Sequence, residues 1–431
     1  MDTATVETVQ PCPECGAEIR RDSRFPSWCA ACDWNVDPEP SEEKKGRLAR
    51  ARLALTRRHS ERLLAELSAG GTLRARRDAS AVLAFTVALI VHAVTLAVTA
   101  SGIWFVVRGW GGWGMVPGAF LLALGWSLRP RFGRLPKDTP MLRRADAPEL
   151  FALVDEVAHV AGTRSVDTIV VNDWINAGVG SYGVRGRRLL VLGLPLWEIL
   201  SPQQRIALLG HEMGHYVNGD TRHGLVVGTA YRSLITWHYY FESGEHDPLD
   251  EAATLQLIVD LLYVVPRLLV LGVLTLLDRL SMRASQRAEY LADRVAAQAG
   301  STQAALEWMD RLLVSNSAAV TLGREVNRTA LNGPRGKQQT DAWAAGLWER
   351  LAADLASVPE HERERLRRVG ALRAHSVDST HPPTHLRHAC LMIGEPAPPT
   401  VITDEERERR IAGELADART KVARQILQDG Y

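Results

Sequence analysis

The feature that most constrains this chain is a pair of histidines four residues apart in a segment with the signals of a helix. His211 and His215 enclose Glu212 in the run His-Glu-Met-Gly-His, and residues 201–204 (Ser-Pro-Gln-Gln) provide a helix start. Because residues four apart lie on one face of a helix, both imidazoles can occupy neighbouring corners of a tetrahedral zinc site. Glu212 lies beside them and can accept a proton from water. The alternative is a chance grouping on a solvated helix.

A zinc hydrolase needs a third protein ligand, and the helix predicted at 278–298 offers one. Glu289 and Asp293 are four residues apart and therefore share a face. Glu289 would complete a His-His-Glu site whose fourth position stays open. Asp293 could accept the free ring N–H of a ligand histidine and fix its tautomer. Taken alone, this helix reads as an ordinary charged face; the upstream motif makes a metal site the better interpretation.

These motifs resemble the M48 metallopeptidases, membrane-embedded zinc proteases that include the heat-shock protease HtpX and the CAAX-prenyl endopeptidases. The resemblance covers roughly residues 79–395 and rests on three segments in order: His211-Glu-Met-Gly-His215, Glu289-Tyr-Leu-Ala-Asp293 and His381-Pro-Pro-Thr-His-Leu-Arg387, the last similar to the family's H-P-x(4)-R segment.

The resemblance implies roles for four further residues. His381 and Arg387 would line the cleft and stabilise the oxyanion of the transition state, which needs pre-placed donors beyond the metal. Without the other motifs, His381 would read equally well as a chance histidine in a loop. Asn176 and Ala177, before a Gly-rich segment, would belong to the substrate-binding edge strand, to which a peptide adds by main-chain hydrogen bonds. From the residues alone, this segment is either an edge strand or a loop.

An uncharged apolar block at residues 79–107 predicts a membrane-spanning helix. It exceeds the about 20 residues that a bilayer requires, and His92 is its one ionisable side chain. A second, Gly-rich block at 110–128 carries Trp110, Trp113 and Trp126 near its ends, where tryptophans anchor to the membrane interface. A buried pair of core helices is the alternative, but the first block is long and uncharged. We therefore expect a transmembrane hairpin at 79–128.

The distribution of basic residues predicts the orientation of this hairpin. Both flanks are basic, whereas the connection carries Arg108 alone; the flanking residues are Arg74, Arg76, Arg77, Arg129, Arg131, Arg134 and Lys137. The positive-inside rule places both flanks in the cytoplasm. We expect a multi-pass protein of the cell membrane with its N-terminus and catalytic region on the cytoplasmic side. No cleavable signal peptide is expected, because the first apolar block starts too late.

A third apolar block, residues 255–277, separates the two halves of the predicted metal site. Because His211, His215 and Glu289 must meet at one metal, the chain between them cannot cross a membrane an odd number of times. We expect an inserted helical hairpin at about 225–277, joined by an acidic loop at 242–251. It either crosses twice, dips into the membrane or packs on the protease domain. Arg232 and Asp260 should then face protein or a wet cavity.

Four cysteines near the N-terminus predict a second metal site. Two CxxC pairs, Cys12 with Cys15 and Cys29 with Cys32, offer four thiolates to a closed structural zinc site. Disulfides or redox thiols are the alternatives, and a cytosolic location argues against stable disulfides. Residues 1–38 therefore resemble a zinc ribbon with a regulatory or partner-binding role. We expect it to fold on binding zinc and to be independent of the catalytic site.

The remaining segments complete the expected domain organisation. Residues 39–78 read as a charged linker, helical at about 42–67. Strands are predicted at 168–171 and 188–192, and charged helices at 341–372 and 404–428, the latter solvated. The protease domain would span 129–400, followed by a charged C-terminal helix at 401–431.

These predictions combine into a mainly α membrane protein: a zincin-like metalloprotease domain of helices plus a small β-sheet, with transmembrane helices and an N-terminal zinc ribbon. The expected function is a zinc-dependent endopeptidase with one catalytic and one structural zinc ion, acting on peptide or protein substrates and in contact with membrane lipid. The alternative is a membrane scaffold or sensor whose ribbon binds a protein partner. A net charge of +1 and an isoelectric point of about 7.8 lack the strong positive charge typical of nucleic-acid-binding proteins, so no nucleic-acid partner is expected.

Overall fold

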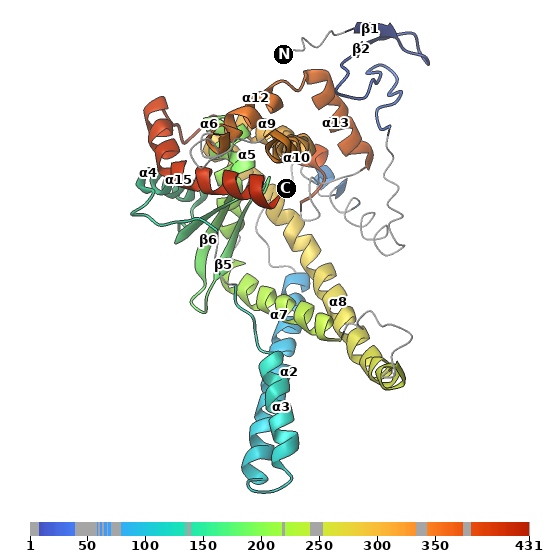
Figure 1. Ribbon diagram of the computed structural model, residues 1–431, viewed down its shortest axis with the longest axis vertical. Helices are drawn as coiled ribbons and strands as arrows, with labels where there is room; N and C mark the ends of the chain where they lie inside the picture. The colour runs from blue at the N-terminus through green and yellow to red at the C-terminus, as the bar shows by residue number, and fades with distance from the viewer. Residues whose placement is uncertain are drawn as a thin grey trace.

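The computed structural model describes residues 8–38, 79–133, 135, 139–217, 220–241, 253–332, 343–373 and 381–430, with scattered positions between 58 and 69. Most of the linker helix expected at 42–67, and all of the acidic loop expected at 242–251, lie outside these residues. Over the described parts the chain is mainly helical, with one four-stranded and one two-stranded sheet (Figure 1). The predicted combination of many helices with a small sheet is therefore confirmed.

The four-stranded sheet forms one layer of the main body, in the order β3-β4-β6-β5. Its strands are β3 (Met141–Leu142), β4 (Thr168–Asn172), β5 (Ala177–Tyr182) and β6 (Arg187–Gly193). The parallel pair β4 and β6 is central, and both strands were predicted from their β-branched and leucine-rich runs. The segment that sequence left open between strand and loop is β5, which pairs antiparallel with β6 along one side only and is therefore an edge strand.

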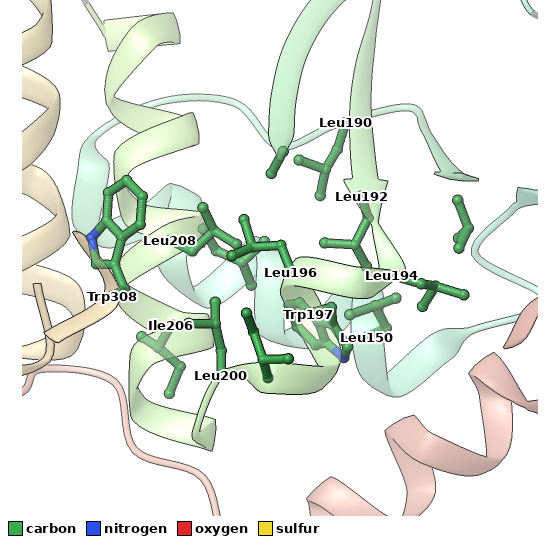
Figure 2. Packing of buried hydrophobic residues seen from close by; sticks show 14 of the residues in the cluster. Leu150, Leu190, Leu192, Leu194, Leu196, Trp197, Leu200, Ile206, Leu208 and Trp308 are labelled. Atoms are coloured by element: carbon green, nitrogen blue, oxygen red, sulfur yellow. The ribbon is translucent and has the colours of Figure 1, made fainter. Parts of the chain in front are cut away.

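Helices cover the sheet and enclose one apolar core. They are α4 (Pro148–Ala161), α5 (Leu194–Ile199), α6 (Pro202–Val217), α9 (Thr302–Leu313), α10 (Ser315–Asn332), α12 (Leu347–Ala356), α13 (Glu360–Arg373), α14 (Thr384–Leu391) and α15 (Glu405–Asp429). Figure 2 shows how Trp197 and Trp308 pack among leucines from β6, α5 and α6. Both indoles are at most 2% exposed. Each fully buried leucine around them contributes about 1.5–3 kcal/mol, which holds α6 firmly in the core.

The C-terminal helix α15 belongs to this core rather than standing as a purely solvated helix. Its buried face consists of Ile411, Leu415, Ala418, Val422, Ala423 and Ile426. On the same helix, Arg407 pairs with Glu156 of α4 at 2.9 Å, and Arg419 pairs with Glu198 of α5 at 3.0 Å. The high charge of this segment concealed the apolar stripe, because a helix needs only one narrow face to dock.

One helix connects the core to the apolar part of the chain. The sequence suggested an apolar block at 255–277 and a separate helix at 278–298, but α8 runs without a break from Ala253 to Gly300. Its 48 residues correspond to about 72 Å at 1.5 Å per residue. No glycine or proline interrupts the junction at 277–278, so the helix continues through it. Pro266 lies within the helix and removes one main-chain hydrogen bond without ending it.

A second helical cluster lies away from the sheet (Figure 1). It consists of α2 (Ala79–Arg108), α3 (Met115–Ser127), α7 (Asp220–Tyr240) and the first part of α8. Their shared apolar contacts include Ala88, Leu234 and Val270. Figure 1 shows α7 leading away from the main body and α8 returning to it; that these helices form an inserted hairpin stays a prediction.

Among the described helices, two are long and apolar enough to cross a membrane: Ala79–Arg108 and Leu261–Ser281. Only 22% of the apolar window in the first helix is buried, which argues against a pair of core helices. The second helix of the expected hairpin is shorter than predicted, because α3 has 13 residues. Trp110 and Trp113 precede α3 and are 78% and 91% exposed. Length and composition alone make these helices candidate spans, and a transmembrane hairpin remains a prediction.

The N-terminal module is a small hairpin joined to α13. Strands β1 (Thr8–Pro11) and β2 (Glu18–Arg21) pair antiparallel. Trp28 and Val36 of this module are 4% and 6% exposed. Side chains of α13 donate hydrogen bonds to the module, so it is held against the helical body in the described structure.

Candidate metal centre

Helix α6 begins as its sequence predicts. The main-chain N–H of Ser201 donates to Gln204 Oε1 at 3.0 Å, and the Gln204 N–H donates to Ser201 Oγ at 3.4 Å. This reciprocal capping box satisfies main-chain groups that the first turn leaves unpaired. The following residues run through the core, so His211 is completely buried and Glu212 is 4% exposed.

Small residues bring α6 and α8 unusually close together. A Cβ atom added to Gly214 would lie 2.6 Å from the Cα of Ala292, and one added to Gly210 would lie 2.9 Å from the Cα of Ala296. Gly210 and Gly214 are four apart on α6, as Ala292 and Ala296 are on α8, so the two faces meet over a full helical turn. This close approach places the residues beside Ala292 within reach of His211.

The three predicted ligands converge across this helix pair. The Nε2 atoms of His211 and His215 are 3.2 Å apart, and Glu289 carboxylate oxygens lie 3.5 Å from the first and 3.8 Å from the second. Donor atoms that share a metal tetrahedrally at about 2.0–2.1 Å are separated by about 3.3 Å. The observed spacing therefore fits one zinc-sized ion, and these residues could hold a metal.

A buried ion pair orients the first histidine. His211 Nδ1 lies 2.9 Å from Asp293 Oδ1, which leaves Nε2 facing the other ligands. Burial alone would raise the pKa of Asp293, but the Arg387 guanidinium and His211 outweigh it and hold that pKa well below its usual range. The carboxylate therefore stays ionised and holds the His211 ring in a single orientation.

Arg387 lies behind the ligands rather than in the cleft that the resemblance implied. Its Nε and Nη2 atoms donate to the two oxygens of Asp293 at 2.9 and 2.6 Å, and its side chain is 1% exposed. Its guanidinium carbon lies 5.4 Å from the centre of the Trp308 ring. Because its Nε–Nη2 edge is occupied by Asp293 and the side chain is buried, the structure assigns Arg387 to the support of Asp293. A direct pair with the buried Asp293 carboxylate compensates the guanidinium for the loss of its hydration, which explains why the side chain lies inside the protein.

His381 lies against the third predicted ligand, Glu289. Its Nδ1 atom is within hydrogen-bond distance of Glu289 Oε2, and its ring centre is 5.5 Å from that of His211. Its side chain is 15% exposed, so it borders the accessible side of the centre. Burial alone would raise the pKa of Glu289, but His381 and the two ligand histidines lower it to about 2. Glu289 is thus an anionic donor at neutral pH.

Glu212 occupies a different electrostatic environment from Glu289. Burial raises the pKa of Glu212, and this effect exceeds the opposite influence of nearby His215 and His381. A carboxylate whose proton affinity is raised in this way suits the acceptance and return of a proton. The surroundings of the two glutamates therefore shift their pKa values in opposite directions, down for Glu289 and up for Glu212.

Tyr216, which sequence reasoning missed, connects the metal helix to the edge strand. Its hydroxyl lies 2.7 Å from the Gly180 carbonyl of β5 and 3.0 Å from the Leu189 carbonyl of β6, and it accepts the Leu189 N–H at 3.2 Å. Burial raises the pKa of Tyr216 to about 12, so the hydroxyl keeps its proton. No motif in the sequence marks Tyr216, because its partners are main-chain carbonyls of two strands that only the fold brings to α6.

The predicted substrate-binding residues stand at the start of β5. The Asn176 side chain accepts the main-chain N–H of Ala177 at 2.9 Å, and Ala177 pairs with Leu192 of β6. The main chain of Asn176 also accepts the N–H of Gly193 at 3.0 Å. A Cβ at Gly193 would lie 1.9 Å from the Trp174 carbonyl, so only glycine permits this close crossing. A cavity of about 830 Å³ lies elsewhere, and none of its lining residues belongs to the metal centre.

The four cysteines also converge. The sulfur atoms of Cys12 and Cys32 are 3.7 Å apart, and those of Cys15 and Cys29 are 3.5 Å apart. Thiolates at about 2.3 Å from one zinc ion are separated by about 3.8 Å in a tetrahedron. All four are free cysteines, and their sulfurs lie within 4.8 Å of one another, so the group fits a zinc-ribbon site. Cys390 is buried, as expected of a small apolar residue.

Comparisons with known proteins agree with this geometry. The family model described as "Peptidase family M48" matches residues 144–392, which is more than half of the chain. The protein named "Protease HtpX homolog 1" of Sulfurisphaera tokodaii is 33% identical over 81 residues, 18% of this chain and 25% of that relative. The chain thus matches only a quarter of the length of this curated relative. No solved structure matches significantly. On the family match and the convergence of its motifs, the chain belongs to peptidase family M48.

Proposed function

We propose that this protein is a membrane-bound, zinc-dependent endopeptidase. The observation that carries the proposal is the convergence of His211, His215 and Glu289, beside a buried Glu212 whose pKa is raised. These residues would hold zinc, which when bound would polarise the scissile carbonyl and acidify a water molecule. The membership of the chain in a peptidase family supports the same reaction class.

In this proposal each residue has a separate task. Glu212 takes a proton from the attacking water and passes it to the nitrogen of the leaving amine. Asp293 and Arg387 keep the His211 ring in place. His381 borders the accessible side and can donate a hydrogen bond to the developing oxyanion.

The substrate is an extended peptide or protein segment. Strand β5 is an edge strand, and Tyr216 ties it to the helix that carries His215. A peptide that adds to β5 through main-chain hydrogen bonds would run alongside the metal centre without requiring a particular side chain. Asn176 and Ala177 at the start of β5 would contact this peptide.

Membrane attachment is the second part of the proposal. Helix α2 is 30 residues long and exposes large apolar side chains such as Leu96 and Val107, each more than 65% exposed. Insertion of α2 into a lipid bilayer would remove this apolar surface from water. The basic flanks of the hairpin favour a cytoplasmic metal centre and N-terminus. In intact cells, a membrane-impermeant thiol reagent should fail to label single cysteines at residues 140 and 294 and should label one at residue 111. Residue 294 is exposed in the structure, so labelling at 294 from outside would refute this orientation.

The catalytic proposal is tested by two substitutions with a matched control. In the purified full-length protein, Glu212→Gln should keep its zinc but lose nearly all hydrolysis of an unfolded protein substrate. Glu289→Ala should lose zinc from the catalytic centre. Glu405→Gln, at an exposed glutamate in the first turn of α15, should behave as the wild type. Wild-type turnover by Glu212→Gln would refute its assignment as general base and favour a scaffold or sensor.

A further inference from the structure

The N-terminal module is attached to one helix by a row of arginines. Arg368 of α13 donates to the Ala30 carbonyl and to Asp33, both at 2.7 Å. Arg365 donates to the Val36 carbonyl at 2.9 Å, and Arg373 donates through Nε to Asp37 at 2.7 Å. Arg365, Arg368 and Arg373 all reach the module, so this contact extends over about two turns of α13.

The acceptor atoms belong to the second cysteine knuckle and to the turn that follows it. Ala30 lies between Cys29 and Cys32, and the N–H of Asp33 donates to the Cys29 carbonyl at 3.0 Å. Asp33 adopts a φ of 58°, a left-handed conformation that costs energy unless its surroundings hold it. Structural zinc binding is coupled to folding in such modules. Loss of the ion from the cysteines would therefore displace the acceptors for Arg368.

The opposite side of α13 leads towards the metal centre. Arg367, next to Arg368, donates to Asp310 of α9 at 3.1 Å. Asp310 lies 3.5 Å from His388 of α14, and the neighbouring Arg387 holds Asp293. The same helix α9 carries Trp308, whose ring centre is 5.3 Å from that of His211. A continuous set of contacts thus runs from the cysteine knuckle to a predicted zinc ligand.

We infer that the zinc ribbon is an intramolecular clamp on the catalytic centre, and that Arg368 is the positioning residue through which it acts. A zinc-loaded ribbon holds α13, and α13 holds α9 and α14 in the arrangement that supports His211. Loss of the ribbon's zinc releases α13 and lowers turnover while the catalytic zinc stays bound. This inference rests on the proposed peptidase function, and it replaces the expectation that the ribbon and the catalytic site are independent.

The size of the effect follows from the exposure of the contacts. The Arg368 and Arg373 side chains are 33% and 28% exposed, so each pair alone contributes little. Arg365 is better shielded, at 11% exposed, and is held by Glu362 at 2.7 Å. Mutations along contact networks of this kind change coupling between sites enough to alter turnover by roughly 2- to 30-fold. We expect a partial loss of turnover rather than its abolition.

The experiment compares several variants of the full-length protein. Cys32→Ser removes a thiolate of the knuckle, Arg368→Ala removes the contact from the other side, and a third variant combines the two. Arg409→Ala is the matched control, since Arg409 is an exposed arginine of α15 and lies outside this set of contacts. Zinc per chain, hydrogen exchange of peptides covering α13 and α14, and kcat and KM on an unfolded protein substrate are measured for each.

The clamp predicts that Cys32→Ser loses one zinc ion, that Arg368→Ala keeps both, and that each raises hydrogen exchange in α13 and α14. Each should lower kcat more than it changes KM, and the double variant should be no worse than the more affected single variant. Arg368→Lys, which keeps the charge but not the two-acceptor geometry, should recover part of kcat.

Unchanged exchange in α14 and unchanged kcat in a Cys32→Ser protein that has lost a zinc ion would overturn the clamp. Additive losses in the double variant would do the same. The exchange measurements also separate this inference from the proposed function: if the wild type hydrolyses nothing, a selective rise of exchange in α13 and α14 still supports the clamp and its absence still refutes it.

Discussion

Substituting Gly214 by alanine tests the close packing of α6 and α8 on which the metal centre depends. Two effects of this change oppose each other. In a helix interior, alanine is favoured over glycine by about 1 kcal/mol. Against this, the new Cβ would lie 2.6 Å from the Cα of Ala292, a main-chain atom that no side-chain rotation can remove.

The structure indicates which effect prevails. Carbon atoms in ordinary contact are separated by about 3.5–4.0 Å, so α6 and α8 would have to separate by about 1 Å at this point. Overpacking of this kind costs about 1–3 kcal/mol, which leaves a net loss of stability of roughly 0–2 kcal/mol after the gain in helix propensity. The same displacement acts between His215 and Glu289. A shift of about 1 Å can cost about 100-fold in rate, and we expect zinc affinity to fall about 10- to 100-fold.

The assay has three parts: chelator competition for zinc affinity, kcat/KM on an unfolded protein substrate, and denaturant unfolding. Gly323→Ala is the matched control, because a Cβ at Gly323 in α10 meets no atom within 4 Å. The control should be stabilised by up to about 1 kcal/mol and bind zinc as the wild type does. If Gly214→Ala is stabilised equally and retains full zinc affinity, the distance between α6 and α8 does not control the metal centre.

Two further substitutions separate support of the metal centre from substrate binding. Arg387→Ala leaves the buried Asp293 carboxylate without its cation and should destabilise the chain by about 3–5 kcal/mol and lower zinc affinity, as measured by unfolding and chelator competition. A loss of kcat with zinc affinity intact would instead support the oxyanion role that the resemblance implied. Tyr216→Phe removes the hydroxyl that ties the Gly180 carbonyl to the metal helix, so KM for a peptide should rise about 5- to 10-fold, corresponding to ~1 kcal/mol, with zinc content unchanged. An unchanged KM would show that β5 is held without this hydroxyl.

Local spacing in the sequence determined the parts of the site that lie within one helix or one turn. His211 and His215 share a face because a helix repeats every 3.6 residues, and the capping box at Ser201 and Gln204 marked where that helix begins. Two CxxC pairs likewise predicted that four sulfurs would meet. The two histidines are near neighbours in the chain, so their geometry follows from backbone conformation. The sulfurs that approach each other belong to different CxxC pairs, so the spacing predicted each pair and the folded module brought the two pairs together.

The family match strengthened these local predictions, because three separated motifs in the same order are specific where each alone is weak. It did not determine what each residue does here. Arg387 was expected to face the cleft, yet it is buried against Asp293. Sequence identifies an arginine that is able to stabilise an anion; only the fold decides which anion lies within its reach.

Contacts between distant segments were decided by tertiary packing. The distance between α6 and α8 depends on whether glycines of one helix face alanines of the other. The residue pattern within one helix does not predict which other helix will pack against it. The docking of the ribbon on α13 depends on carbonyl groups such as that of Ala30, which every residue possesses and whose direction only the folded knuckle sets. Sequence by itself thus determined the chemistry available to this protein and its local geometry. Packing decided which of these groups meet, because side-chain volume and main-chain direction act between elements rather than within them.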